Sequence, residues 1–283
     1  MANIRVIRRR IRSIKNIAKI TKAMEMVAAS KMKKAQERGL AGRPYAEKIQ
    51  HVIADLAALP EMRVHPLLQH RPAAKIAIVH ITPDRGLCGG LNSNMNRNAA
   101  DFILEQKIPV TLITVGHKGL DFMMRYDRNI RAEFSQLGDQ PVLLDTFPIS
   151  RIIIDDYTAG TIDMVYLSYA RFISTTIQKP VLQQLLPVIP AIIPAGQNVE
   201  YIYEPDSETV LGELLPRFVE IEVYHAILET IASEQSARMV AMRNATDNAN
   251  ELMGDLTLLY NKARQESITK ELLDIVGGVA ALG

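Results

Sequence analysis

The sequence predicts an α/β protein with a long antiparallel α-helical coiled coil, in which the N- and C-terminal helices pair and a small α/β domain is inserted between them. Two observations predict this fold class. Apolar residues recur at helical spacing at both ends of the chain, and short apolar runs alternate with helical segments in the middle. The expected division is 1–59 for the N-terminal helix, 73–200 for the inserted domain and 207–283 for the C-terminal helix.

The C-terminal apolar stripe is the strongest of these patterns. Between Leu211 and Ala263, alternating steps of three and four residues mark 16 positions, and 13 of them are apolar. Such a stripe over about seven heptads is typical of a coiled coil, because an ordinary globular helix ends after three or four turns. We expect one helix over Ser207–Val276, with Pro216 marking either its start or a kink.

The N-terminal stripe has a similar spacing and predicts a helix to about residue 57. Its positions are Ile4, Ile7, Ile11, Ile14, Ile17, Ile20, Met24 and Val27. The extra run of threes predicts a local overwinding of the supercoil, and Gly39, Gly42 and Pro44 predict a weakened place further along. Neither helix can bury its stripe alone, so we expect the two helices to bury each other.

The middle of the chain alternates between strand and helix patterns. Strands are expected at Lys75–Thr82, Pro109–Val115, Ile130–Phe134 and Ile162–Phe172, and helices from Asn92 or Ser93 to Gln106, at Gly116–Tyr126 and at Phe147–Tyr157. This alternation predicts a Rossmann-like, mostly parallel sheet covered on both faces. Gln178–Ile193 is expected as a strand at the border of the sheet, because its prolines exclude a central position.

Composition excludes several classes of protein. Cys88 is the only cysteine, which leaves no internal disulfide and no cysteine-based metal site. We expect no signal peptide and no membrane span, so contact with a membrane is expected only through partners. Residues 1–40 carry 12 basic and 2 acidic residues, whereas the remainder carries 21 basic and 29 acidic residues. A helix this basic indicates an acidic partner surface or polyanion, or else a solvated face.

No catalytic, cofactor-binding or metal-binding residue is predicted from the sequence pattern. The turn from Asp84 to Asn92 lies between a strand and a helix, but its glycines do not match Gly-x-Gly-x-x-Gly and no phosphate loop follows. We therefore favour a structural turn over a phosphate site. The six histidines show no spacing typical of metal ligands. A nucleotide-sensing or nucleic-acid-binding coiled-coil protein with an α/β domain remains the alternative to a structural role.

Several motifs resemble one family over the whole chain. They are Ile20–Met32, Asp84–Asn92, Ser233–Met242, Tyr260–Glu271 and Asp274–Gly278. These segments resemble the gamma subunit of F-type, proton-translocating ATP synthases, in the family's order, with one departure where Val279 replaces an alanine. The resemblance implies a central-stalk rotor that couples ion-driven rotation of the membrane c ring to ATP synthesis or hydrolysis at the catalytic head.

The resemblance also implies the partners. One copy is expected per complex, with three alpha and three beta subunits, an epsilon subunit and the c ring. The complex is expected on the cytoplasmic face of the bacterial plasma membrane, without nucleic acid. The catalytic residues would belong to the beta subunit, so this chain is expected to be non-catalytic and to carry no cofactor.

Four sets of contact residues follow from the resemblance. The beta lever segment is expected to meet Met24, Lys19, Lys22, Lys31 and Lys33. A beta catch loop is expected at Arg264 and Gln265, and a bearing tip at Ile275, Val276, Val279 and Leu282. The c ring is expected to contact Tyr203, Glu204 and Asp206. Met24 also lies on the apolar stripe, so a core role stays open for it, and a frayed terminus stays open for the tip.

Overall fold

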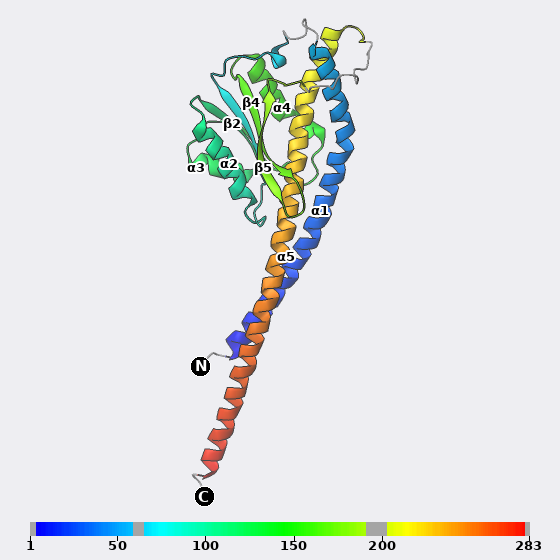
Figure 1. Ribbon diagram of the computed structural model, residues 1–283. Helices are drawn as coiled ribbons and strands as arrows, with labels where there is room; N and C mark the ends of the chain where they lie inside the picture. Colours follow the sequence, from blue (N-terminus) through cyan, green and yellow to red (C-terminus); the bar gives the residue numbers. More distant parts are fainter. Residues whose placement is uncertain (1–3, 59–64, 191–202, 281–283) are drawn as a thin grey trace. The chain divides into compact units, whose positions relative to one another are not determined.

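The computed structural model describes residues 4–58, 65–190 and 203–280, with side chains to residue 277 (Figure 1). The chain divides into two compact units. The smaller unit combines residues 1–28 with 239–283, and the larger unit is formed by residues 29–238. Helices α1 (Ile4–Ala58) and α5 (Ser207–Ala280) each contribute to both units. Pro44 and Pro216 lie inside these helices and end neither of them.

The larger unit is built on a five-stranded sheet of order β3-β2-β1-β4-β5. Its strands are β1 (Ile76–Ile81), β2 (Val110–Val115), β3 (Ile130–Phe134), β4 (Met164–Phe172) and β5 (Gln178–Leu186). The first four strands are parallel, whereas β5 pairs with β4 in the antiparallel direction. The predicted mostly parallel sheet with a border strand is confirmed, and β5 ends earlier than the predicted Ile193. The strand order is that of a doubly wound fold, in which the order of the strands reverses between β1 and β4.

Helices cover both faces of this sheet (Figure 1). On one face, α2 (Leu91–Glu105) and α3 (His117–Arg125) pack on Ile76 and Ile78 of β1. On the other face, α4 (Leu143–Thr158) and parts of α1 and α5 pack on Val79 and Ile81, next to a short 3-10 helix, η2 (Pro66–Leu68). Because side chains alternate along a strand, one buried apolar strand supplies both cores.

Two helices begin at residues that the sequence pattern did not predict. Helix α2 starts after Gly90 rather than at a cap on Asn92 or Ser93, and Asn92 Nδ2 instead donates to the Arg85 carbonyl over 3.3 Å. Helix α4 starts four residues earlier than expected. The Asp145 carboxylate accepts the Val142 N–H over 2.8 Å and so stabilises the first turn.

Within each unit, α1 and α5 pack against each other. In the larger unit, Ile49, Ile53 and Leu56 of α1 share a core cluster with Leu211, Leu215 and Val219 of α5. In the smaller unit, Thr21 bonds to Thr246 over 2.7 Å, and Glu25 accepts from Arg243 over 3.0 Å. Rising numbers on α1 meet falling numbers on α5, so the pair is antiparallel as predicted.

The predicted C-terminal stripe is confirmed in the smaller unit. Met239, Met242, Thr246 and Ala249 are buried at steps of three and four residues. The stripe continues through the half-buried positions Met253, Leu256, Tyr260 and Ala263, whose neighbours are exposed. The hydrophobic pattern therefore identified the face of α5 that meets α1.

The predicted N-terminal stripe is wrong at three of its positions after Ile14, and only Met24 among them is half-buried. The side chains of Ile17, Ile20 and Val27 are 49%, 59% and 54% exposed. The buried positions are instead the small or polar residues Ala18, Thr21, Glu25 and Ala28. These positions keep the regular steps of three and four from Ile14, so the spacing that predicted a local overwinding is not that of the buried residues. Small residues let the two backbones approach closely, and the two polar ones find partners on α5.

Candidate functional site

A turn at the carboxyl end of β1, residues 84–90, is held in place by other parts of the larger unit. The Asp84 carboxylate accepts the backbone N–H of His117 over 3.0 Å and that of Gln136 over 3.1 Å. The Arg238 guanidinium of α5 donates to the Gly86 carbonyl over 3.0 Å. The turn is therefore bonded to the loops that follow β2 and β3, and also to α5.

Helix α5 also bonds to the backbone at the carboxyl end of β4. Ser233 Oγ donates to the Ala170 carbonyl over 2.9 Å, and Thr230 Oγ1 accepts the Ala170 N–H over 3.3 Å. The Glu229 carboxylate accepts the Phe172 N–H over 2.8 Å. Ser236 Oγ adds a bond to the Thr175 carbonyl over 2.8 Å. The sequence pattern gives the motif Ser233–Met242 no role of its own, and in the structure its first half joins α5 to the sheet.

One ion pair lies at the centre of this joint. Arg238 Nη2 and Glu234 Oε1 are 2.6 Å apart, and their side chains are only 11% and 13% exposed. Burial raises the pKa of the Glu234 carboxyl, and the positive charge of Arg238 opposes that rise. The two charges therefore depend on each other, because either one left alone in this place would be desolvated without a partner.

Doubly wound sheets bind ligands at the carboxyl ends of their strands, near the point where the strand order reverses. At this carboxyl edge, a cavity of about 50 Å³ is lined by the ends of β1 and β2, by the segment after β3 and by Ile227, Thr230, Ile231 and Glu234 of α5. Gly116 lets the ends of β1 and β2 approach closely, since a Cβ there would lie 1.9 Å from the Thr82 carbonyl oxygen. Helix α5 fills the place that a nucleotide takes in related folds, which agrees with the predicted structural turn.

A buried histidine fastens α2 to the sheet. His80 Nε2 donates to Asn96 Oδ1 over 2.9 Å, so its Nδ1 accepts the hydroxyl proton of Ser168 over 3.0 Å. Burial lowers the pKa of His80 to about 4, which keeps the ring neutral at physiological pH. Over the described ranges 4–58, 65–190 and 203–280, no cluster of His, Cys, Asp and Glu side chains is arranged to hold a metal ion.

The five residues predicted to meet the beta lever are divided between the two units. In the smaller unit, Lys22 pairs with Glu25 over 3.0 Å, Lys19 is exposed without an ion pair to a described residue, and Met24 is half-buried. In the larger unit, Lys31 pairs with Asp139 over 2.6 Å, and Lys33 lies 3.8 Å from Glu37. Three of the four lysines therefore have intramolecular partners that the sequence pattern did not reveal.

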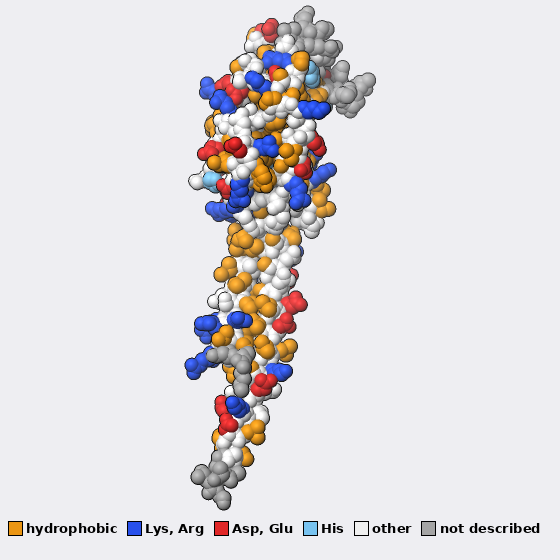
Figure 2. All heavy atoms as spheres, turned by 90° about the vertical axis from the view of Figure 1, so that its left-hand side faces the viewer, with side chains coloured by type: hydrophobic (Ala, Val, Ile, Leu, Met, Phe, Trp, Pro, Cys, Tyr) orange, Lys and Arg blue, Asp and Glu red, His pale blue; other side chains and the backbone are white. Residues whose placement is uncertain are grey.

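The predicted catch residues and the bearing residues up to Val279 lie on α5. Arg264 and Gln265 are exposed, as are Ile275 and Val276, and hydrophobic side chains are visible toward this end of the helix (Figure 2). Val279 belongs to α5, and Leu282 lies outside the described residues. None of the helices in the described part of the chain is long and apolar enough to span a membrane.

The predicted c-ring contact residues precede α5 in the larger unit. Tyr203 packs against the core cluster, whereas Glu204 and Asp206 are exposed. The Asp206 carboxylate accepts the Thr209 N–H over 2.8 Å and the Thr209 hydroxyl over 2.9 Å. These hydrogen bonds lower the pKa of Asp206. Asp206 therefore caps α5, a structural role that the sequence analysis missed although an Asp before a helix is the usual signal.

Comparison with known proteins adds independent evidence. The sequence matches the family described as ATP synthase over residues 3–282. It is 70% identical over 284 residues to a protein named ATP synthase gamma chain from Dehalococcoides mccartyi, with 100% of both chains covered. It is 52% identical over 287 residues to the ATP synthase gamma chain of a Roseiflexus species, which covers 100% of this chain and 99% of that one.

Solved structures have the same fold. A chain from the central stalk and c ring of the Tetrahymena thermophila mitochondrial ATP synthase is 27% identical, with a TM-score of 0.63 over 80% of this chain and 99% of that chain. A chain from the OSCP/F1/c-ring assembly of Euglena gracilis is 22% identical and supports the fold with a TM-score of 0.68, over 99% of this chain and 94% of that chain. The chain belongs to the ATP synthase gamma-chain family.

Proposed function

We propose that this chain couples ion-driven rotation of a membrane c ring to ATP synthesis or hydrolysis at the head of an ATP synthase. The chain is a gamma subunit of ATP synthase and thus part of the central stalk and rotor of an enzyme complex. The observation that carries the coupling role is the antiparallel pairing of α1 and α5, bonded through Thr21 to Thr246 and through Glu25 to Arg243. A pair of helices resists twisting better than one helix does, and the bonds between them prevent one helix from sliding along the other. Torque transmission requires both properties.

We further propose that the chain contributes no catalytic residue to this enzyme. The small cavity at the carboxyl edge of the sheet and its closure by α5 support this, because a nucleotide has no room there. The same feature argues against the alternative of a nucleotide sensor that uses the usual site of the fold. ATP turnover would then belong to the three alpha and three beta subunits, around one copy of this chain.

The remaining partners are also proposals. The chain would contact an epsilon subunit and the c ring, reach the membrane only through them, and face the cytoplasm of a bacterium, without binding nucleic acid. The segments 1–59, 73–200 and 207–283 are proposed to be domains with separate roles, in which the two helical segments enter the catalytic head. A tagged chain purified from detergent-solubilised membranes should carry alpha, beta, epsilon and c subunits in constant ratio, and their absence would contradict the proposal.

Residue contacts with the head are proposed for two surfaces. Met24, Lys19, Lys22, Lys31 and Lys33 would meet the acidic lever of beta. Lys19 is the member best placed to bind a carboxylate, because it is exposed and has no ion pair to a described residue. Arg264 and Gln265 would meet the catch loop. The exposed Ile275 and Val276, with Val279 and Leu282, would form a smooth apolar bearing.

Contact with the c ring is proposed for Tyr203, Glu204 and Asp206. Because Asp206 caps α5, the test variant combines Glu204→Lys with Asp206→Asn, which removes the charge and keeps a cap. Proton pumping by vesicles that contain this variant should fall, while ATP hydrolysis by the detached head stays unchanged. Asp155→Lys, an exposed charge reversal on α4, is the matched control and should pump normally. Normal pumping by the Glu204→Lys, Asp206→Asn variant would contradict the assignment.

A further inference from the structure

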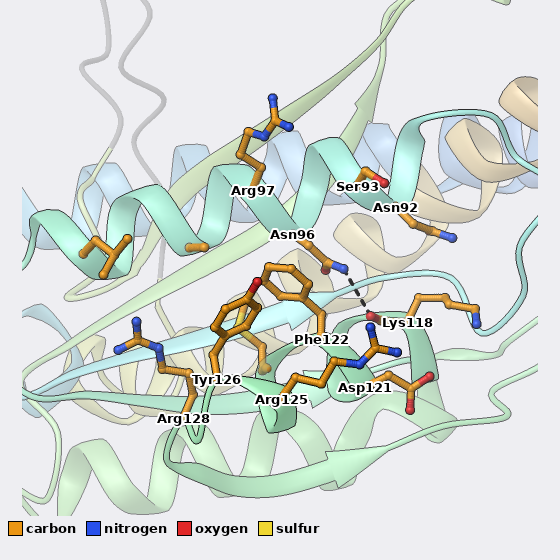
Figure 3. Close-up of a pocket in the computed structure, with 13 residues that line it drawn as sticks. Asn92, Ser93, Asn96, Arg97, Lys118, Asp121, Phe122, Arg125, Tyr126 and Arg128 are labelled. Carbon is orange, nitrogen blue, oxygen red and sulfur yellow. Dashed lines mark hydrogen bonds between the residues drawn. The ribbon is translucent and has the colours of Figure 1, made fainter.

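An open groove of the larger unit lies between α2 and α3, on the face of the sheet away from α4 (Figure 3). Its volume is about 580 Å³, which is within the range of small-molecule sites. Asn96, Ala100 and Leu104 line it from α2 at steps of four residues, and Ala100 leaves the space open. Lys118, Phe122 and Arg125 line it from α3 at steps of four and three, so both helices present one face to the same groove.

The groove is strongly basic. Four cationic side chains line it, Arg97, Lys118, Arg125 and Arg128, against the single acid Asp121. Residues 41–283, by contrast, hold 21 basic and 29 acidic residues. The positive charge is therefore concentrated locally rather than a property of this part of the chain.

The arginines of the groove are also unpaired. Among the described residues of the larger unit, the arginine side chains without a hydrogen bond, ion pair or ring contact are those of Arg85, Arg97, Arg125 and Arg128. Three of these four line the groove. The other described arginines of this unit bond to carboxylates, amides, a phenol or a backbone carbonyl. In Figure 3, Arg125 and Arg128 lie on either side of Tyr126, whereas Arg97 points away from α3. A guanidinium group left free beside a concave surface is ready to bind an anion, above all a phosphate.

Two aromatic rings lie beside these charges. The ring centroids of Phe122 and Tyr126 are 4.9 Å apart and the planes are tilted by 51°. Phe122 is half-buried, and Tyr126 is exposed and lies in the middle of the groove (Figure 3). An exposed aromatic face next to cations is the combination that holds a nucleobase and its phosphates together, because the base stacks while the phosphates pair.

We propose that the groove between α2 and α3 binds a nucleotide, with its phosphates on Arg125, Arg128 and Lys118 and its base against Tyr126. This site is separate from the carboxyl edge of the sheet, which α5 closes. It is also separate from the surfaces proposed for the head and the c ring. A nucleotide site on a rotor subunit would let nucleotide levels act on it independently of the catalytic head.

The test is a calorimetric titration of the full chain with ATP, pyrophosphate and adenosine. ATP should bind saturably and at least tenfold more tightly than pyrophosphate or adenosine, since each of these supplies only one part of the contact. Arg125→Gln with Arg128→Gln should weaken ATP binding tenfold or more, since charge-assisted hydrogen bonds are lost. Tyr126→Ala should abolish the preference for ATP over pyrophosphate. If Tyr126→Ala fails to fold, Tyr126→Leu serves the same purpose.

Arg151→Gln is the matched control, because it removes an exposed charge from α4 outside the groove. It should leave ATP binding unchanged. The proposal is overturned if ATP does not bind saturably, or if Arg151→Gln weakens binding as much as the groove variants do. It is also overturned if a polyglutamate peptide binds as tightly as ATP, which would indicate an acidic protein as the partner.

Discussion

Thr21 and Thr246 join α1 to α5 through hydroxyl oxygens that lie 2.7 Å apart inside a largely apolar seam. Thr246 also donates to the Met242 carbonyl over 2.8 Å, and Thr21 lies 3.1 Å from the carbonyls of Ile17 and Ala18. One helical turn along, Glu25 accepts from Arg243. Apolar seams tolerate sliding by whole turns, whereas a buried polar pair is satisfied in only one register. These two contacts therefore fix how α1 and α5 align.

A double-mutant cycle on the threonine pair measures this contact. Thr246→Val keeps the shape of the side chain and removes the bond, so the free energy of unfolding should fall by about 1 kcal/mol. Thr21→Val should cost a similar amount, and the double variant should cost less than the sum, because either single change already removes the bond between the two hydroxyls. Urea unfolding of the full chain checks this. Fully additive losses would mean that the two hydroxyls do not interact.

The Glu25 carboxylate should make the helix pair sensitive to acid. Hydrogen bonds from Lys22 and Arg243 lower the pKa of Glu25 in the folded protein. The stability that this gives is present above the unfolded pKa of about 4.5 and is lost as pH falls through the lower folded pKa. Glu25→Gln should remove that part of the pH dependence of unfolding, and Glu251→Gln, an exposed position on α5, should not. Equal pH profiles for Glu25→Gln and the parent would refute the role.

Most of the fold follows from the sequence because its signals are local. The strand patterns, the two long helices and the stripe on α5 each depend on neighbouring residues, and each is found in the structure. The seam of α1 was mispredicted because hydrophobicity favours Ile17 and Ile20, while burial of Glu25 depends on Arg243, 218 residues away. A one-dimensional pattern carries no information about such a partner.

The candidate sites were less predictable for the same reason. The motif around Arg238 was recognised, but its contact with Gly86 spans 152 positions and appears only when α5 packs against the sheet. The groove between α2 and α3 was missed altogether. Its signal is Lys118, Phe122 and Arg125 on one helical face, and such spacing is also typical of an ordinary solvated helix.

Exposed isoleucines on α1 should matter little for the stability of the chain alone. Ile17→Ala removes a side chain that is half exposed, so the free energy of unfolding should change by no more than about 0.5 kcal/mol. Ala18→Leu adds bulk to the buried seam and should cost about 1–3 kcal/mol through overpacking. Thermal unfolding of both variants distinguishes the two positions. A larger loss of stability for Ile17→Ala than for Ala18→Leu would indicate that Ile17, as the hydrophobic pattern predicts, faces the seam.

Breaking the ion pair of Glu234 and Arg238 should reduce stability more than replacing both of its residues does. Arg238→Met leaves a buried carboxylate unpaired and the Gly86 carbonyl without its donor, so stability should fall by about 3–5 kcal/mol. Adding Glu234→Gln removes the stranded charge and should restore part of that loss. Chemical denaturation of the single and double variants measures it. A double variant less stable than Arg238→Met alone would show that Glu234 has another partner that matters more.

The neutral, buried His80 should make the larger unit unfold more easily as pH falls from about 6.5 to 4. Its pKa is lowered to about 4 in the folded protein by burial, against about 6.5 when unfolded. Below pH 6.5 the unfolded chain therefore binds a proton that the folded chain cannot bind. The full stability is present above pH 6.5, and it should have fallen by about 3 kcal/mol at pH 4, where the folded ring begins to titrate too.

His80→Gln keeps a donor for Asn96 and cannot titrate, so its free energy of unfolding should be lower at pH 7 but should change less across this pH range. Unfolding by urea at a series of pH values compares the two slopes, with His117→Gln, on the half-buried first residue of α3, as the control that should retain the parent slope. A His80→Gln profile as steep as that of the parent would assign the acid sensitivity to another group.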